Sequence, residues 1–279
     1  MSVMRTPGGF RTQWVWRPVL TTLLAVGLVP GAGLRLPSSP PGDQVWMATP
    51  GTIGRIQRFD PSIARLFFDR STSYGLNGGW NSATPAFSWA SEAAFERDLR
   101  RDRIAPEITT VMYDPEYWAA TPLSEQQHPI EAMRAFASAA RAAGYRVVLT
   151  PHPNLVEVPG AECSAQPGET IQAAFLRCGI IGAAAEQADV VEIQTQFLER
   201  HTSTYAAAVR ALARQARAAN PDVVVLAGLS TRFTLDARTL LTAWSAVRHV
   251  VDGHYLAIPQ GIQPWVAAKF LELVAQKPS

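Results

Sequence analysis

Two acidic residues follow a short apolar segment near the middle of the chain. Residues 108–118 read Ile-Thr-Thr-Val-Met-Tyr-Asp-Pro-Glu-Tyr-Trp, so Asp114 and Glu116 come directly after a run typical of a buried β-strand. Because Pro115 cannot donate to a sheet ladder, the strand is expected to end near Asp114. Paired acids at the carboxyl end of a strand in a β/α chain lie where active sites form. The alternative interpretation is that Asp114 only caps the following turn.

Another carboxylate, Glu192, lies inside the apolar segment Val-Val-Glu-Ile-Gln-Thr-Gln that ends at Gln196. In a strand, Glu192, Gln194 and Gln196 share one face, and the apolar residues between them share the other. Since the helix-covered face of a barrel strand should be apolar, Glu192 and Gln194 are expected to point into the barrel mouth. A carboxylate there must be paired, or its pKa rises. The alternative is a purely structural network of Glu192 with an arginine or a glutamine.

These acids have the requirements of glycoside hydrolysis, in which a carboxylic acid of raised pKa faces an ionised carboxylate. Glu192 is the expected acid/base, and Asp114 or Glu116 is the expected second carboxylate. In that chemistry the two groups lie roughly 5–9.5 Å apart, and Asp69 is a further candidate for the second group. Nearby aromatic side chains could stack on sugar rings: Tyr74, Trp80, Tyr113, Tyr117 and Trp118.

Other polar or aromatic side chains are expected to bind substrate because they stand at or beyond the carboxyl ends of strands: Asp69, Tyr113, Trp118, His152, Asn154, Gln194 and His254. His152 is flanked by prolines and could orient a substrate, although a plain loop role is the alternative. Metal-dependent hydrolysis through Asp69, Asp114, His152 and Glu192 is a third hypothesis without a recognised ligand spacing. The segment Gly-Leu-Ser-Thr-Arg from Gly228 lacks the second glycine of a serine-hydrolase elbow. No cofactor is expected.

The elements that must position these residues alternate between strand and helix patterns. Strands are expected at 45–48, 64–69, 108–114, 145–150, 189–194, 222–227 and 250–258, and helices at 91–103, 129–143, 168–187, 202–220, 236–248 and 264–275. A further strand is expected within 49–64 or 71–86. This spacing predicts a (β/α)8-type TIM barrel whose first β/α unit is irregular or missing. An open doubly wound sheet is the alternative, but no strand is followed by a nucleotide-binding glycine motif.

The first 33 residues have the layout of a secretory signal peptide. Three arginines precede an uncharged run from Pro18 to Leu34, and no acid occurs before Asp43. An uncleaved membrane anchor is the alternative, although the run is short for a span. Residues 34–42 form a Pro/Ser-rich spacer, and 43–279 are expected to form a single secreted, monomeric barrel domain. The net charge of +2 gives no reason to expect a nucleic-acid partner, so the expected partner is a carbohydrate or another small molecule.

The two cysteines, Cys163 and Cys178, flank a polar, turn-rich segment. An even number of cysteines in an exported chain predicts a disulfide. Closing a loop of this size stabilises a fold by about 3 kcal/mol in the chain-entropy model. No CxxC motif or Cys/His cluster indicates a structural zinc site.

The β/α repeat, the export pattern and the carboxylates at strand ends resemble the secreted glycoside-hydrolase-type TIM barrels. More narrowly, residues 111–118, 121–129 and 190–197 are similar to a group of exported bacterial proteins without an assigned activity, over about residues 87–275. The broad resemblance implies a barrel and a glycan substrate, and the narrow one brings no catalytic residues. Glycosidase barrels often carry their acid and nucleophile on the fourth and seventh strands, whereas the expected order puts Asp114 on the third and Glu192 on the fifth. A non-catalytic envelope or carbohydrate-binding protein on the same fold is the main alternative.

Overall fold

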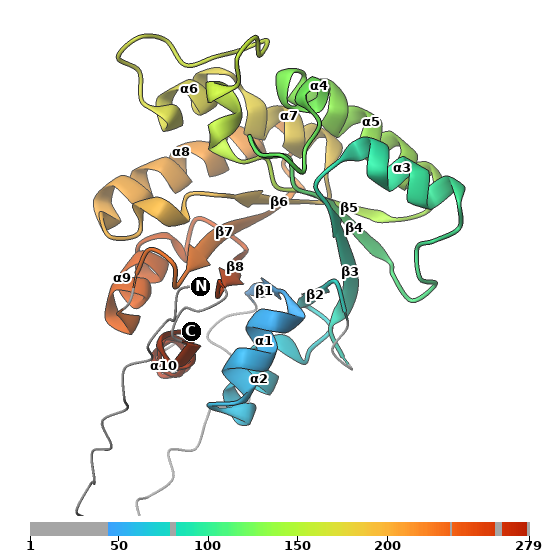
Figure 1. Ribbon diagram of the computed structural model, residues 1–279. Coiled ribbons are helices and arrows are strands. Elements are labelled where there is room, and N and C mark those ends of the chain that lie inside the picture. The colour runs from blue at the N-terminus through green and yellow to red at the C-terminus, as the bar shows by residue number, and fades with distance from the viewer. Residues whose placement is uncertain (1–43, 79–81, 235, 260–263, 278–279) are drawn as a thin grey trace, which may run out of the picture. The chain divides into compact units, whose positions relative to one another are not determined.

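Eight parallel strands close into a barrel in the computed structural model, which describes residues 44–78, 82–234, 236–259 and 264–277. Each strand pairs with the next one in the sequence, and β8 pairs with β1 (Figure 1). The strands are β1 (Val45–Ala48), β2 (Tyr74–Leu76), β3 (Thr84–Trp89), β4 (Thr110–Tyr113), β5 (Arg146–Leu149), β6 (Val190–Ile193), β7 (Val224–Ser230) and β8 (Gly253–Ala257). The predicted TIM barrel is therefore confirmed.

Helices cover the outer face of the barrel: α1 (Pro50–Gln57), α2 (Pro61–Phe68), α3 (Glu92–Arg100), α4 (Leu123–Gln127), α5 (Pro129–Ala142), α6 (Ile171–Arg177), α7 (Ile180–Gln187), α8 (Thr202–Ala219), α9 (Ala237–Val247) and α10 (Pro264–Ala275). Short 3₁₀ turns are η1 (Pro153–Glu157) and η2 (Gln196–Leu198). Apolar side chains form two layers. One, which includes Met47, Met112 and Leu226, fills the barrel, and the other packs the sheet against the helices.

The amino-terminal part of the barrel differs from the sequence prediction. Residues 64–69 were expected to form a strand, but they belong to α2 and its cap. Asp60 accepts hydrogen bonds from the Ser62 and Ile63 N–H groups, and Pro61 occupies the first helical position. These start signals, which precede the predicted segment, override the β propensity of the aromatic residues within it. Strand β2 lies within residues 71–86, one of the two regions proposed for the further strand, and β3 begins in that region and ends at Trp89.

The predicted helical stretch 168–187 consists of two helices. Gly179, with φ of 71°, occupies the left-handed region and separates α6 from α7. Cys178 immediately precedes this glycine and forms a disulfide with Cys163, with Cα atoms 5.8 Å apart. The predicted disulfide is therefore confirmed, and it ties the loop after η1 to the end of α6.

The barrel closes where β8 meets β1. Val45 of β1 lies opposite Gly253 of β8, and a Cβ atom on Gly253 would overlap the Val45 carbonyl oxygen. Glycine is therefore required at this seam. Residues 1–33 and 34–42, predicted as signal peptide and spacer, lie outside the described residues. Within the part of the chain that the structure describes, no helix combines the length and apolarity needed to cross a bilayer.

Candidate active site

A pocket of about 230 Å³ lies at the carboxyl ends of β4 to β8. Its lining combines three carboxylates with amides, one arginine and several aromatic rings. The residues are Met112, Asp114, Glu116, His152, Glu192, Gln194, Gln196, Phe197, Ser230, Arg232, Phe233, Tyr255, Ala257 and Pro259. This is the end of a β/α barrel at which active sites form, and strands β1 to β3 contribute none of these residues.

Asp114 follows β4 directly and accepts two side-chain hydrogen bonds at Oδ1. The Thr150 hydroxyl donates at 2.8 Å and Gln194 Nε2 donates at 2.7 Å. Burial, and then the neighbouring Glu116 carboxylate, raise the pKa of Asp114 to about 6, while the two donors act in the opposite direction. Asp114 therefore has partners that favour its ionised form.

Glu192 points into the barrel from β6 and is only 1% exposed. Its Oε1 accepts a hydrogen bond from Gln196 Nε2 at 3.1 Å. Burial, and then the charges of Asp114 and Glu116, raise its pKa well above the ordinary value of a glutamic acid. Within the described residues no arginine forms an ion pair with Glu192. In this part of the chain, the structural network considered as an alternative is therefore absent with an arginine but present with a glutamine, as the hydrogen bond from Gln196.

Two polar residues flank these acids. Burial raises the pKa of Glu116, and the positive charge of Arg232 partly offsets this effect. Nδ1 of His152 accepts a hydrogen bond from the Asn154 N–H at 3.1 Å, so a neutral His152 carries its proton on Nε2. Burial lowers the pKa of His152, which favours this neutral form. His152 can therefore donate a hydrogen bond in the pocket without adding a charge.

Two of the residues expected to bind substrate lie outside the pocket, between the sheet and the helices. The Tyr113 hydroxyl donates to Glu125 at 2.7 Å, and its ring stacks on Phe136. The His254 ring packs near Trp46 and Trp244, and burial lowers its pKa to about 3. Strand alternation explains both corrections, because the adjacent residues Met112 and Tyr255 line the pocket instead.

Other predicted residues lie at the rim of the barrel or at its opposite end. Asp69 ends α2 before β2, at the amino ends of the strands, where it accepts a hydrogen bond from the Ser82 N–H. Asn154 Oδ1 accepts the Tyr117 N–H at 2.9 Å, so it shapes the loop after β4. Trp118 is 46% exposed in that loop and does not line the pocket. Trp80 lies outside the described residues.

Comparison with known proteins assigns no family to the chain. No protein-family model matches the chain, and no curated protein matches it. Triosephosphate isomerase from Bartonella henselae aligns over 84% of this chain and 100% of its own, with 11% identity and a TM-score of 0.40. A sugar phosphate isomerase/epimerase from Parabacteroides distasonis aligns over 86% and 99%, with 9% identity and a TM-score of 0.46. At these values the similarities carry no argument about chemistry, and the fold rests on the strand pairing itself.

Sequence reasoning missed several residues of the pocket. Phe197 follows Gln196 directly, and Arg232 and Phe233 follow β7 closely. The available signal was their position just beyond strands that the sequence did predict. With the added amino-terminal strand, Asp114 follows the fourth strand and Glu192 lies on the sixth, which corrects the expected third and fifth.

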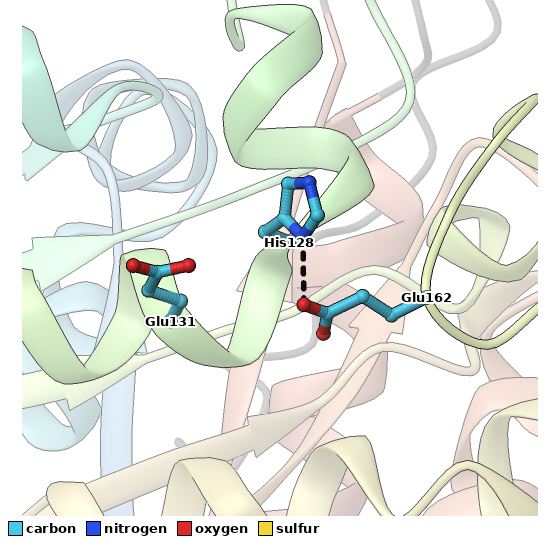
Figure 2. A group of neighbouring side chains, drawn as sticks. All are labelled: His128, Glu131 and Glu162. Atoms are coloured by element: carbon cyan, nitrogen blue, oxygen red, sulfur yellow. Dashed lines mark hydrogen bonds and ion pairs between the residues drawn. The ribbon is translucent and has the colours of Figure 1, made fainter.

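The four residues of the metal-hydrolysis hypothesis do not form a ligand cluster in the described residues. The cluster found there is His128, Glu131 and Glu162, whose ligand atoms lie within 4.8 Å of one another on the outer surface (Figure 2). His128 Nδ1 and Glu162 Oε1 are 2.6 Å apart, and Glu131 lies in the first turn of α5. The contact between His128 and Glu162 and the favourable helix-terminal position of Glu131 account for this arrangement without a metal ion.

Proposed function

We propose that the chain is an exported glycoside-hydrolase-like enzyme that cleaves a glycan in the pocket. The observation that carries the proposal is the unequal environment of two acids in one pocket. Asp114 accepts hydrogen bonds from a hydroxyl and an amide, whereas Glu192 is more deeply buried and accepts one from an amide. Environments that separate the pKa values of two carboxyl groups assign one as the acid and the other as the ionised partner.

In this proposal the protonated Glu192 acts as general acid. Its proton passes to the glycosidic oxygen as the bond between that oxygen and the anomeric carbon breaks. The ionised Asp114 stabilises the positive charge that develops on the sugar, or attacks it as a nucleophile, and Glu116 is the alternative second carboxylate. Water then supplies the hydroxyl group of the product. The anomeric configuration of the product distinguishes a retaining from an inverting reaction.

The remaining pocket residues would bind the substrate. The His152 Nε2–H and the Gln194 amide are hydrogen-bonding groups suited to sugar hydroxyls, and Phe197 and Phe233 offer apolar ring faces. Tyr117 and Trp118 expose their rings in the loop after β4 and could bind a second sugar unit. Export is part of the proposal, supported by the disulfide and by the signal-peptide pattern of residues 1–33.

Hydrolysis of a panel of aryl glycosides by Glu192→Gln and Asp114→Asn tests the proposal. We expect a loss of about 10²–10⁴-fold in kcat/KM for each variant, because proton transfer or charge stabilisation is removed. The exposed residue Glu186 of α7 provides the matched control Glu186→Gln, which should keep full activity. Activity should rise as pH increases through about 6, where Asp114 ionises, and fall at higher pH as Glu192 loses its proton.

Two outcomes would contradict the proposal. A wild-type protein that binds oligosaccharides but hydrolyses none of them would be a binding protein on the same fold. Activity that disappears after chelation and returns with a divalent cation would support metal-dependent hydrolysis instead. Activity that persists in a chelator while Glu192→Gln is inactive supports acid–base catalysis by the chain itself.

A further inference from the structure

Gly228 of β7 lies directly against two side chains of the pocket. It is not among the glycines with positive φ, so its backbone conformation does not require glycine. A Cβ atom at Gly228 would come within 2.6 Å of Glu192 Oε1, and closer still to Gln196 Nε2. Real Cβ atoms essentially never approach other atoms so closely. A side chain at Gly228 would therefore displace the ends of Glu192 and Gln196, and glycine leaves the space in which the two side chains meet.

The pair lies against a strand that is itself fixed from the helix side. Gln196 begins η2, is only 8% exposed, and donates from Nε2 to Glu192 Oε1 at 3.1 Å. On the helix side, the Tyr205 hydroxyl of α8 donates to the Gly228 carbonyl oxygen at 3.1 Å. The strand beneath the pair is thus fixed to α8, and the amide and the carboxyl group are confined against it.

This arrangement distinguishes the two oxygens of Glu192. In a neutral carboxyl group, the oxygen that accepts an N–H hydrogen bond acts as the carbonyl oxygen, and the other oxygen carries the proton. We propose that Gln196 is a positioning residue that, seated on Gly228, holds Oε1 of Glu192 and reserves Oε2 for the exchangeable proton. Its catalytic consequence rests on the proposed function. In proton transfer, the bond from Oε2 to hydrogen breaks, a bond from hydrogen to the leaving oxygen forms, and the electron pair stays on the carboxylate.

Infrared difference spectroscopy tests this contact without a substrate. The carbonyl band of protonated Glu192 is the band that Glu192→Gln removes. In Gln196→Leu this band should move to higher frequency, because the carbonyl oxygen loses a hydrogen bond. The pH at which the band disappears should rise by about one unit, because the ionised form loses a donor. A band with unchanged frequency and unchanged titration midpoint would overturn the proposal.

Two glycine substitutions provide a second test and its matched control. Gly228→Ala should displace the amide and shift the same band. Gly182 of α7 also lies against a glutamine, with its Cβ position 3.2 Å from Gln215 Cγ, and Gly182→Ala should leave the band unchanged. Gln196→Met retains length and apolar packing, so it serves as the second variant if Gln196→Leu fails to fold. An unshifted band in a folded Gln196→Met protein would also overturn the proposal.

The spectroscopic result and the activity result separate the two proposals. If the band shifts but the protein hydrolyses no glycoside, the positioning contact is supported and the proposed function is contradicted. If the enzyme is active and its carbonyl band is unchanged in Gln196→Leu, the positioning role is contradicted and the proposed function is not. If both proposals hold, Gln196→Leu should also move the high-pH limb of the activity profile upward, which a purely structural effect on folding would not do.

Discussion

Glu125 and Glu192 are both almost fully buried, at 8% and 1% exposure, yet their surroundings differ sharply. Glu125 lies behind the barrel wall and accepts four hydrogen bonds, from the Ser91 and Tyr113 hydroxyls and from the N–H groups of Glu92 and Ala93. Glu192 lies inside the barrel mouth and accepts one, from an amide. Four donors can compensate an ionised carboxylate for its lost hydration, whereas one amide cannot.

The comparison indicates that the number of donors around a buried acid distinguishes an anchor from a reactive group. Glu125 caps the start of α3 from α4 and fixes two helices and a strand to one another. Glu199 is intermediate, because it accepts hydrogen bonds from the Ser230 N–H and the Thr234 hydroxyl. Each of the three acids can be tested by substituting its side chain and measuring the stability of the protein.

The largest loss of stability is expected for Glu125→Ala. The substitution leaves the Tyr113 hydroxyl buried without its acceptor and removes the acceptor of the Glu92 and Ala93 N–H groups at the start of α3, so the free energy of unfolding should fall by about 2–4 kcal/mol. Urea denaturation measures this value. Glu186→Ala, at an exposed site on α7, is the control and should change stability by less than about 0.5 kcal/mol. Equal losses of stability in the two variants would contradict the anchoring role of Glu125.

An intermediate effect, seen as pH dependence, is expected for Glu199→Gln. Burial raises the pKa of Glu199 to about 8, so the folded state holds a proton that the unfolded state releases near pH 4.5. Stability from this group is therefore present at low pH and is lost as pH rises from about 4.5 to 8. As the pH rises across this range, the melting temperature of Glu199→Gln should fall less than that of the wild-type protein. If the melting temperatures of the wild type and the variant change with pH in parallel, Glu199 does not hold a proton in the folded state.

The smallest loss is expected for Glu192→Gln. At pH 5 the wild-type carboxyl group is protonated, and glutamine has nearly the same shape, so the unfolding free energy should change by less than about 1 kcal/mol. Because the pKa of Glu192 is raised, ionisation destabilises the folded wild type at high pH, and the variant should become the more stable protein there. Denaturation at pH 5 and pH 9 measures both values. A large loss at pH 5 would identify Glu192 as another anchor.

The carboxyl-terminal two-thirds of the fold could be predicted from the sequence because helix and strand signals agree there. In α8, for example, Tyr205, Val209 and Leu212 recur at helical spacing and are buried as expected. The amino-terminal region resisted prediction because β2 has only three residues, too few to show a period. Asp60 and Pro61 carry the start signals of α2, but the β propensity of the aromatic residues that follow them predicts a strand.

The candidate site was predictable where strand parity alone decides orientation. Alternation placed Glu192 and Gln194 in the barrel mouth, as the structure does. The same rule, applied to β4 and β8, would have directed Tyr113 and His254 toward the helices. For Arg232 and Phe233 the sequence offers only their position just beyond β7. That their side chains line the pocket could not be predicted, because the path of this loop depends on the contacts that Glu199 makes with Ser230 and Thr234.

The seam between β1 and β8 has a consequence for how the polypeptide acquires its structure. Val45 and Gly253 are neighbours in the closed sheet, although almost the whole barrel sequence separates them. One edge of β1 therefore stays unpaired until the last strand of the barrel has been synthesised, and contacts between such distant residues form slowly. Closure of the barrel is thus a late event that no amino-terminal fragment can complete. Closure of the ring then requires glycine at position 253, because the side chain of any larger residue would overlap the backbone of β1.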